Sequence, residues 1–192
     1  FYLFYDRGQT ILSRRVEGQT LQMAPAWIDA HMDCRLVLYR NCRNTAEIGR
    51  TVGSFIERRH KNYLSDVHGK RPCAVFVSQT EALAQAAADF VRRMRSAERL
   101  ELRDIVILTV STLAKSVLGS LTELAGIPVS HKPEEGKLWL TTVRRYKGLE
   151  AKAVLLVDVR VSQLTNQTCQ RLIYVGSSRA TAYLETLFLN DV

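Results

Sequence analysis

Short apolar runs that alternate with amphipathic stretches limit this chain to one broad class of folds. One run, Ala74–Val77, is followed by apolar residues at helical spacing between residues 83 and 94. Another run, Ile105–Val110, is again followed by such a stripe. Strands without polar alternation are buried on both faces. The order therefore predicts an α/β fold, with a parallel sheet covered by helices on both faces.

The same alternation predicts the elements along the chain. We expect strands at Phe1–Tyr5, Arg35–Tyr39, Ala74–Val77, Ile105–Val110, Leu138–Leu140, Val154–Val157 and Tyr183–Leu189. We expect helices that open with capping boxes at Asn44 and Ser78, helices over Leu113–Leu124 and Gln163–Ala180, and an irregular segment or short helix over Arg14–Asp33. Ligands of such sheets bind at the carboxyl ends of strands. This rule places Asp6–Gln9, Asn41–Thr45 and the charged turn Arg144–Lys152 on the ligand edge.

The amino-acid composition favours one class of binding partner and one cellular compartment. The 192 residues carry 27 Lys and Arg against 19 Asp and Glu, and the net charge of +8 favours an anionic partner, nucleic acid before nucleotide phosphates or a membrane surface. Cys34, Cys42, Cys73 and Cys169 form no Cys-x-x-Cys pair, and His31-x-x-Cys34 has no second half. We therefore expect reduced thiols, no metal site and a cytoplasmic protein. No run is apolar and long enough to cross a membrane.

The sequence contains no phosphate-binding glycine loop. Such a loop needs a Gly five positions before a Gly-Lys pair and a Ser or Thr after it. The Gly-Lys pairs at 69–70 and 136–137 are followed by Arg71 and Leu138, and neither has the earlier Gly. We therefore expect that this sequence by itself does not hold ATP and Mg²⁺ in the usual way.

Four segments nevertheless resemble, in family order, the motifs of UvrD/Rep-type superfamily 1 helicases. Asp6–Gln9 (DRGQ) resembles motif III, Asn41–Asn44 (NCRN) motif IV, Tyr146–Glu150 (YKGLE) motif V and Leu172–Ala180 (LIYVGSSRA) motif VI. Motifs I, Ia and II are missing. The resemblance implies that residues 1–33 are the end of a first RecA-like domain and a linker, and that residues 34–192 are the second RecA-like domain. Because the chain opens without Met on an apolar run, we expect a fragment of a longer protein.

The resemblance implies an ATP-dependent DNA helicase or translocase, with the ATP site between its two RecA-like domains. The missing N-terminal domain would supply the glycine loop and the carboxylates for Mg²⁺. ATP and Mg²⁺ are therefore expected in the full-length protein, and this fragment alone is expected to be inactive. The implied partners are single-stranded DNA and the missing domain of the same chain.

The motifs also imply roles around the nucleotide. Arg43 and Arg179 would stabilise the charge of the transferred phosphoryl group, because a guanidinium fork matches charge that is spread over several oxygens. Gln9 would sense the γ-phosphate. Glu150, beside Gly148, would accept a hydrogen bond from the ribose. An ordinary surface ion pair is the alternative interpretation of each charged residue.

Thr142, Arg144 and Arg145 lie where the family touches the DNA backbone, and hydroxyl and guanidinium groups suit phosphate oxygens. A solvated basic turn is the alternative interpretation. Cys42 stands where the family commonly has a Tyr that stacks on adenine, so we expect base recognition to be weaker or to come from another residue.

Three hypotheses about the function of the whole chain remain, and the third is the least favoured. The first is the motor domain of a helicase, and the second is a degenerate RecA-like module that binds nucleic acid or protein without ATP turnover. An unrelated doubly wound enzyme is the third, which the order of the motifs disfavours.

Overall fold

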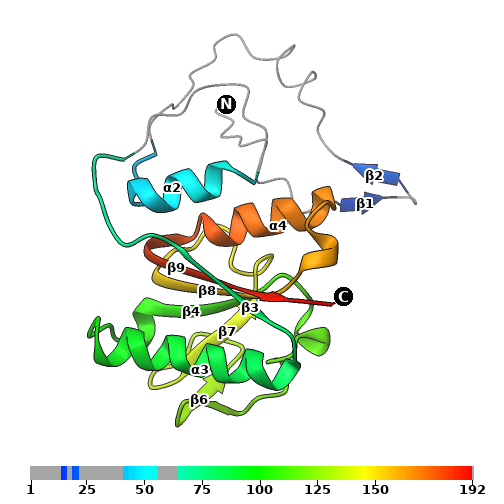
Figure 1. The fold of residues 1–192 in the computed structure, drawn as a ribbon. Coiled ribbons are helices and arrows are strands. Elements are labelled where there is room, and N and C mark those ends of the chain that lie inside the picture. The colour runs from blue at the N-terminus through cyan, green and yellow to red at the C-terminus, as the bar shows by residue number, and fades with distance from the viewer. Residues whose placement is uncertain (1–13, 17–18, 22–40, 56–64, 192) are drawn as a thin grey trace.

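A seven-stranded sheet with the order β3-β9-β8-β4-β7-β6-β5 forms the centre of the molecule (Figure 1). The computed structural model describes residues 14–16, 19–21, 41–55 and 65–191. The strands are β3 Cys73–Val77, β4 Ile105–Thr109, β5 Glu123–Leu124, β6 Ile127–Ser130, β7 Leu138–Thr142, β8 Ala151–Arg160 and β9 Ala180–Leu189. Neighbouring strands are parallel except for β5 and β6. The α/β fold with a parallel sheet is therefore confirmed.

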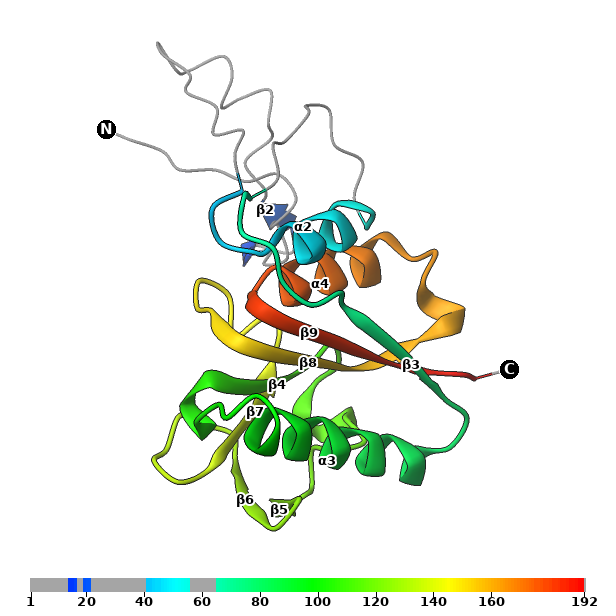
Figure 2. The ribbon, with the colours of Figure 1, turned by 60° about the vertical axis from the view of Figure 1, so that its left-hand side comes forward.

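Helices cover both faces of this sheet, as Figures 1 and 2 show from two sides. Helices α2 (Ala46–Gly53) and α4 (Gln167–Ser177) lie on one face, and α3 (Thr80–Ser96) lies on the other. The described connections contain the short 3-10 turns η2 Leu102–Asp104, η3 Leu113–Lys115 and η4 Val161–Gln163. Strands β1 (Arg14–Val16) and β2 (Gln19–Leu21) form a separate antiparallel pair, where we expected an irregular segment or a short helix.

Strand β8 shows why the apolar runs do not alternate with polar residues. Its side chains point in turn to the two faces, as in any strand. Val154 and Leu156 join the core beneath α2 and α4, whereas Leu155 and Val157 join the core beneath α3. All four are completely buried, because helices cover both faces. The continuous apolar run is thus the consequence of a two-sided cover.

The predicted helix over Leu113–Leu124 is wrong. Residues 113–115 form one 3-10 turn, Ser116 is extended with φ −72° and ψ 139°, and β5 begins at Glu123. A Cβ on Gly119 would lie 1.8 Å from the carbonyl oxygen of Leu113, so the chain folds back too tightly for a regular helix. The apolar spacing still predicted burial, since Leu118 and Leu124 belong to the core beneath α3.

The helix starts differ from the predicted ones. Helix α4 begins at Gln167, not at Gln163, because the Asn166 side chain accepts hydrogen bonds from the N–H groups of Thr168 and Cys169. The capping boxes expected at Asn44 and Ser78 are wrong, since the N-caps of α2 and α3 are Thr45 and Gln79 and neither side chain makes a capping bond. The predicted strands Phe1–Tyr5 and Arg35–Tyr39 lie outside the described residues.

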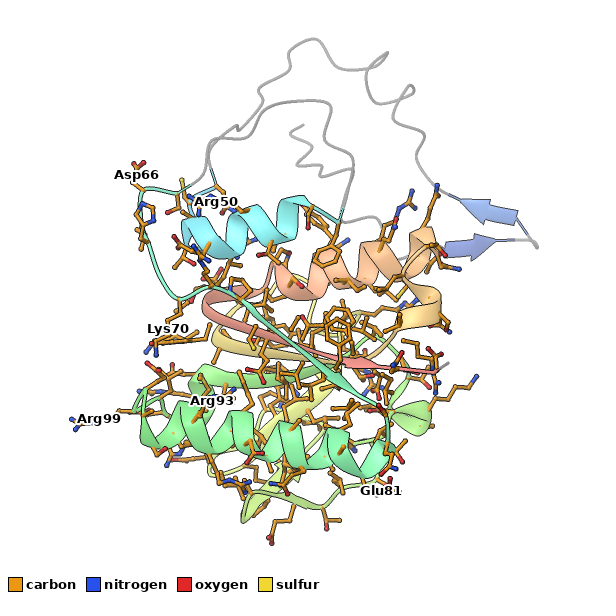
Figure 3. The ribbon with its side chains drawn as sticks, in the orientation of Figure 1. Arg50, Asp66, Lys70, Glu81, Arg93 and Arg99 are labelled. Carbon is orange, nitrogen blue, oxygen red and sulfur yellow. The ribbon has the colours of Figure 1, made fainter. Side chains whose placement is uncertain are left out.

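A segment that we call the strap, residues 65–72, runs from the start of α2 to β3. The Glu47 carboxylate of α2 accepts a hydrogen bond from the Gly69 N–H (2.8 Å) and lies 2.9 Å from Nδ1 of His68. Farther along the strap, Lys70 bonds to Glu98 just after α3. Figure 3 shows this course, with Asp66 beside α2 and Lys70 toward the end of α3. The strap therefore connects helices on opposite faces of the sheet.

Candidate nucleotide and nucleic-acid sites

The charged turn that follows β7 crosses the sheet from one end to the other. At its start, the Val143 N–H donates to the Thr109 carbonyl at the carboxyl end of β4 (3.0 Å). At its end, the Ala151 N–H donates to the Arg179 carbonyl at the amino ends of β8 and β9 (3.1 Å). Because β7 and β8 are both parallel to β4, their connection has to return to the opposite end. The expectation that the whole of Arg144–Lys152 lies on the carboxyl edge is therefore wrong.

Tyr146 fixes the middle of this crossover. Its N–H donates to the Thr142 carbonyl (3.1 Å), and its hydroxyl donates to the Glu150 carbonyl (2.9 Å). The ring is 3% exposed and packs edge-on against Trp139. Burial, helped by the nearby Glu150 charge and opposed by Arg179, raises the pKa of Tyr146 to about 12. The hydroxyl therefore stays a hydrogen-bond donor at neutral pH.

Gly148 lets the crossover turn before Glu150. Its φ is +95°, in the left-handed region that a residue with a side chain rarely adopts, and nothing lies within 4 Å of where a Cβ would be. The constraint at this position is thus in the backbone angle and not in the space around it.

Residues of three motif segments meet at the amino ends of β8 and β9. Arg43 Nε lies 2.9 Å from Glu150 Oε2, and both side chains are exposed. Asn44 Nδ2 donates to the carbonyls of Ser178 (3.2 Å) and Ala180 (2.5 Å). We call Arg43, Asn44, Glu150 and Arg179 the amino-end cluster. The segment 41–45 was also expected at the carboxyl edge, and this expectation is wrong for the described geometry.

Arg179 is the buried member of the amino-end cluster. Its side chain is 1% exposed, its Nε donates to the Val175 carbonyl (3.0 Å) and its Nη2 donates to the Ser178 hydroxyl (2.8 Å). These bonds fold the guanidinium back onto the end of α4. In this conformation Arg43, not Arg179, is the arginine of the cluster that solvent reaches.

The residues predicted to contact DNA lie at the opposite, carboxyl end of the sheet. Arg144 and Arg145 begin one residue after the end of β7 and are exposed. Thr142 is half-buried, and its hydroxyl accepts a hydrogen bond from the Arg145 N–H (3.2 Å). The structure thus separates Arg43, Glu150 and Arg179 from the predicted DNA residues by the length of the sheet.

The structure describes only some of the remaining residues that the sequence analysis named, which are Gln9, His31 and the four cysteines. Gln9, His31 and Cys34 lie outside the described residues. Cys42 and Cys73 are exposed, and Cys169 is a buried cysteine whose thiol pKa is raised by burial. In the described part of the chain, no group of three or more His, Cys, Asp or Glu is placed to hold a metal ion. No helix there has the length and apolar character needed to cross a membrane.

The sequence patterns missed the residues that hold the site together. The capping box and motif IV both include Asn44, but neither predicts that it bridges the end of α4 and the start of β9. Motif V includes Tyr146, but it does not predict the hydrogen bonds that fix the crossover. No motif includes Asp158, a buried carboxylate in β8 at the carboxyl end. A polar residue inside an otherwise apolar strand was the available signal.

Comparisons with known proteins give one family match and a similar solved structure. Residues 137–184 match the family model of the UvrD-like helicase C-terminal domain. The resemblance to UvrD-type helicases is confirmed. The matched segment contains the whole crossover, the strand β8 and all of α4, and with them Gly148, Glu150 and Arg179. A comparison with curated proteins gives no match.

Among solved structures, the C-terminal domain of a possible DNA helicase from Lactobacillus plantarum WCFS1 has a similar fold. The TM-score is 0.61 at 21% sequence identity, and the alignment covers 77% of this chain and 86% of that chain. At this sequence identity the similarity shows a shared fold and does not assign a role to any single residue.

Proposed function

We propose that this chain is the second RecA-like domain of a superfamily 1 ATP-dependent DNA helicase or translocase. The observation that carries the proposal is the amino-end cluster, in which Arg43, Glu150 and Arg179 come together from motifs IV, V and VI. The UvrD-like match over residues 137–184 supports the same reading. The helicase activity belongs to the full-length protein, in which an N-terminal RecA-like domain holds the glycine loop.

The amino-end cluster fits the second half of an ATP site. The Arg43 side chain is exposed and, among the described residues, pairs only with the exposed carboxylate of Glu150, so little free energy opposes its transfer to a phosphate. Glu150 then becomes free to accept a hydrogen bond from the ribose, beside the turn at Gly148. ATP with Mg²⁺ supplies the phosphoryl group, and the carboxylates for Mg²⁺ and the sensing Gln9 belong to the first domain in this proposal.

Arg179 fits the role of a phosphate partner only after a movement. Its guanidinium has to leave the Val175 carbonyl and the Ser178 hydroxyl when nucleotide and the first domain are bound. Both are neutral acceptors, and a phosphate offers the stronger, charge-assisted hydrogen bonds. Without this movement Arg179 acts as a structural anchor of α4.

Thr142 and the exposed arginines that follow it at the carboxyl end form the DNA track in this proposal. Thr142, Arg144 and Arg145 would contact phosphates of single-stranded DNA, which positions the strand without reading its sequence. The amino-end cluster and the track lie at opposite ends of the sheet, and the crossover that Tyr146 fixes connects them.

The proposal is tested by measuring how fast the full-length protein hydrolyses ATP in the presence of single-stranded DNA. Arg43→Ala and Arg179→Ala should each lower kcat by about 10³-fold or more while DNA affinity stays near normal. Arg103→Ala, which removes an exposed arginine that pairs only with Glu101 among the described residues, is the matched control and should change neither quantity. Near-normal turnover of Arg179→Ala would assign that residue to the anchor role.

A second candidate is a RecA-like module that binds nucleic acid or protein without ATP turnover. Two observations favour it: the buried side chain of Arg179 and the Cys42 thiol where the family has an aromatic ring. Full-length protein that binds single-stranded DNA but hydrolyses no ATP would establish this candidate. In either case, the 192-residue chain alone should hydrolyse ATP no faster than the background.

A further inference from the structure

A strained and buried carboxylate lies at the carboxyl end of the sheet. Asp158 is 7% exposed, and its φ of +63° lies in the left-handed region. The pairing of β8 with β9 shifts register between Leu156 and Val159, so Asp158 sits in a bulge. A side chain in the left-handed region is disfavoured unless its surroundings hold it there. Asp158 is therefore held in place by specific contacts.

Those contacts organise the segment after β4, residues 110–118, which we call the β4 loop. The Thr109 hydroxyl donates to Oδ2 of Asp158 (2.5 Å), and the Val117 N–H donates to Oδ1 (3.1 Å). The same Thr109 hydroxyl accepts a hydrogen bond from the Ser111 N–H (3.0 Å). One carboxylate thus fixes both ends of the β4 loop.

Within the described residues, the Asp158 carboxylate is held by these hydrogen-bond donors and not by a cation. Among the described residues, no Lys, Arg or His forms an ion pair with it. Burial of a carboxylate is unfavourable, and hydrogen bonds to the charged form offset that cost. An apolar residue could fill the space, but it could not accept the hydrogen bonds of Thr109 and Val117. The position therefore serves the geometry of the β4 loop.

The β4 loop lies beside the residues of the proposed DNA track. Strand β4 runs between β8 and β7, and its last residue, Thr109, pairs with Thr142. The β4 loop exposes Thr112 and Lys115. In the described structure, none of Lys115, Arg144 and Arg145 forms an ion pair with a carboxylate. Hydroxyls and unpaired cations on one edge are the groups that bind backbone phosphates.

We infer that Asp158 is a positioning residue for binding the nucleic-acid backbone, and that Thr112 and Lys115 of the β4 loop extend the phosphate track begun by Thr142. This inference rests on the proposed function, because it adds a second segment to the same track. Asp158 does not touch the nucleic acid. It holds the β4 loop so that Lys115 stands at the same edge as Arg144 and Arg145.

The experiment measures binding of the 192-residue chain to a fluorescein-labelled oligothymidylate by fluorescence anisotropy at low salt. Lys115→Ala should weaken binding several-fold and make the salt slope shallower by about one phosphate contact. Asp158→Gly keeps the left-handed backbone without strain but removes both hydrogen bonds. It should weaken binding to a similar degree, and in that background Lys115→Ala should add less than about twofold, because its side chain is no longer held at the track. Arg103→Ala, at the other end of the sheet, is the charge-matched control and should retain more affinity than Lys115→Ala.

Amide hydrogen exchange of the same variants separates positioning from folding. Asp158→Gly should raise exchange at Ser111 and Val117 while β4 and β8 stay protected. If Asp158→Gly does not fold, Thr109→Val provides the same comparison, since it removes the Thr109 bond at nearly constant volume. Loosened amides with unchanged DNA affinity would overturn the inference and leave the proposed function standing. A wild-type chain that does not bind the oligonucleotide at all would overturn the DNA track itself.

Discussion

At the scale of single residues, Asn44 shows how one buried side chain assembles the candidate site. Its amide donates to the carbonyls of Ser178 and Ala180, on either side of Arg179, and its own carbonyl accepts from Asn41. The residue is 4% exposed, so its side chain is shielded from bulk water. Arg43 precedes it directly, and the position of Arg43 against Glu150 therefore depends on Asn44.

Asn44→Asp should destabilise the fold strongly, although it only replaces the side-chain NH₂ group by an oxygen. A carboxylate cannot donate, so it would face two carbonyl oxygens that have lost their donor. We expect a loss of about 2–4 kcal/mol in the free energy of unfolding, since each buried unsatisfied group costs roughly 1–3 kcal/mol. Urea unfolding of the 192-residue chain measures this quantity.

The neighbouring Asn41→Asp is the matched control for this prediction. The Asn41 side-chain oxygen accepts hydrogen bonds from the N–H groups of Arg43 and Asn44, which an Asp oxygen can also accept, so this variant loses only the single donor bond to Asn44 Oδ1. It should therefore cost much less. Equal losses for the two variants would show that the donor at Asn44 does not hold the cluster.

At the scale of elements, α4 approaches β8 unusually closely at Gly176. A Cβ at this position would lie 2.7 Å from Cδ1 of Leu156 and 2.9 Å from Cγ2 of Val143. Both neighbours are buried, and Val143 opens the crossover. The close approach brings the end of α4, and with it Arg179, against the motif V segment.

Gly176→Ala should lower the free energy of unfolding, although Ala is the better helix former. Overpacking costs about 1–3 kcal/mol, and the gain in helix propensity is about 1 kcal/mol, so we expect a net loss of roughly 1 kcal/mol. Combining it with Leu156→Val, which shortens one of the two clashing side chains, should cost less than the sum of the single losses. Strict additivity in urea unfolding would contradict the close packing.

The strap depends on the ionised carboxylate of Glu47. Hydrogen bonds from His68 and then from the Gly69 N–H lower the pKa of this group to about 2. A carboxyl whose pKa is depressed on folding stabilises the folded state above its unfolded pKa and loses that contribution as pH falls. The strap should therefore stay attached at neutral pH and loosen as pH falls from about 4.5 toward 2.

Hydrogen exchange of the Gly69 amide measures directly how firmly the strap is attached to α2. Glu47→Ala should raise exchange at Gly69 already at neutral pH. The control is Glu81→Ala, because Glu81 holds the same first-turn position in α3 but makes no contact with the strap. A protected Gly69 amide in Glu47→Ala would show that the backbone bond from Ala46 to Val67 is sufficient to hold the strap.

At the scale of the whole molecule, the two ends of the sheet have different chemistry. The amino end presents the arginine–glutamate pair of the cluster, whereas the carboxyl end presents Lys115, Arg144 and Arg145 without acidic partners in the described residues. With a net charge of +8, long-range attraction brings a polyanion to the molecule, and the unpaired cations decide where it binds.

Binding of single-stranded DNA to this chain should accordingly be weak and strongly dependent on salt. Each neutralised phosphate contributes about −0.7 to the slope of log K against log salt for a single strand. Arg144→Ala and Arg145→Ala should each make the slope shallower, whereas Arg43→Ala should not. Anisotropy titrations between roughly 50 and 200 mM salt provide these slopes. Affinity that does not change with salt would indicate base stacking instead of phosphate contacts.

The sequence by itself determined the class of fold and the segments that matter. Apolar runs without alternation required a sheet covered on both faces, because only then are both sides of a strand buried. Local spacing also identified the buried leucines of residues 113–124, the helix of residues 80–96 and the motif V and VI segments. These properties depend on residues that are close in the chain, and a sequence pattern records such relations.

Only the tertiary structure decided where those segments meet. Arg43 and Glu150 are 107 residues apart and Asn44 and Ser178 are 134 apart, so no local pattern specifies their contact. The parallel order β8-β4-β7 forces the crossover to span the sheet, and this separates Glu150 from Thr142. The same packing turned an expected helix into the β4 loop, because the Asp158 carboxylate captures the Val117 N–H that a helix would have used.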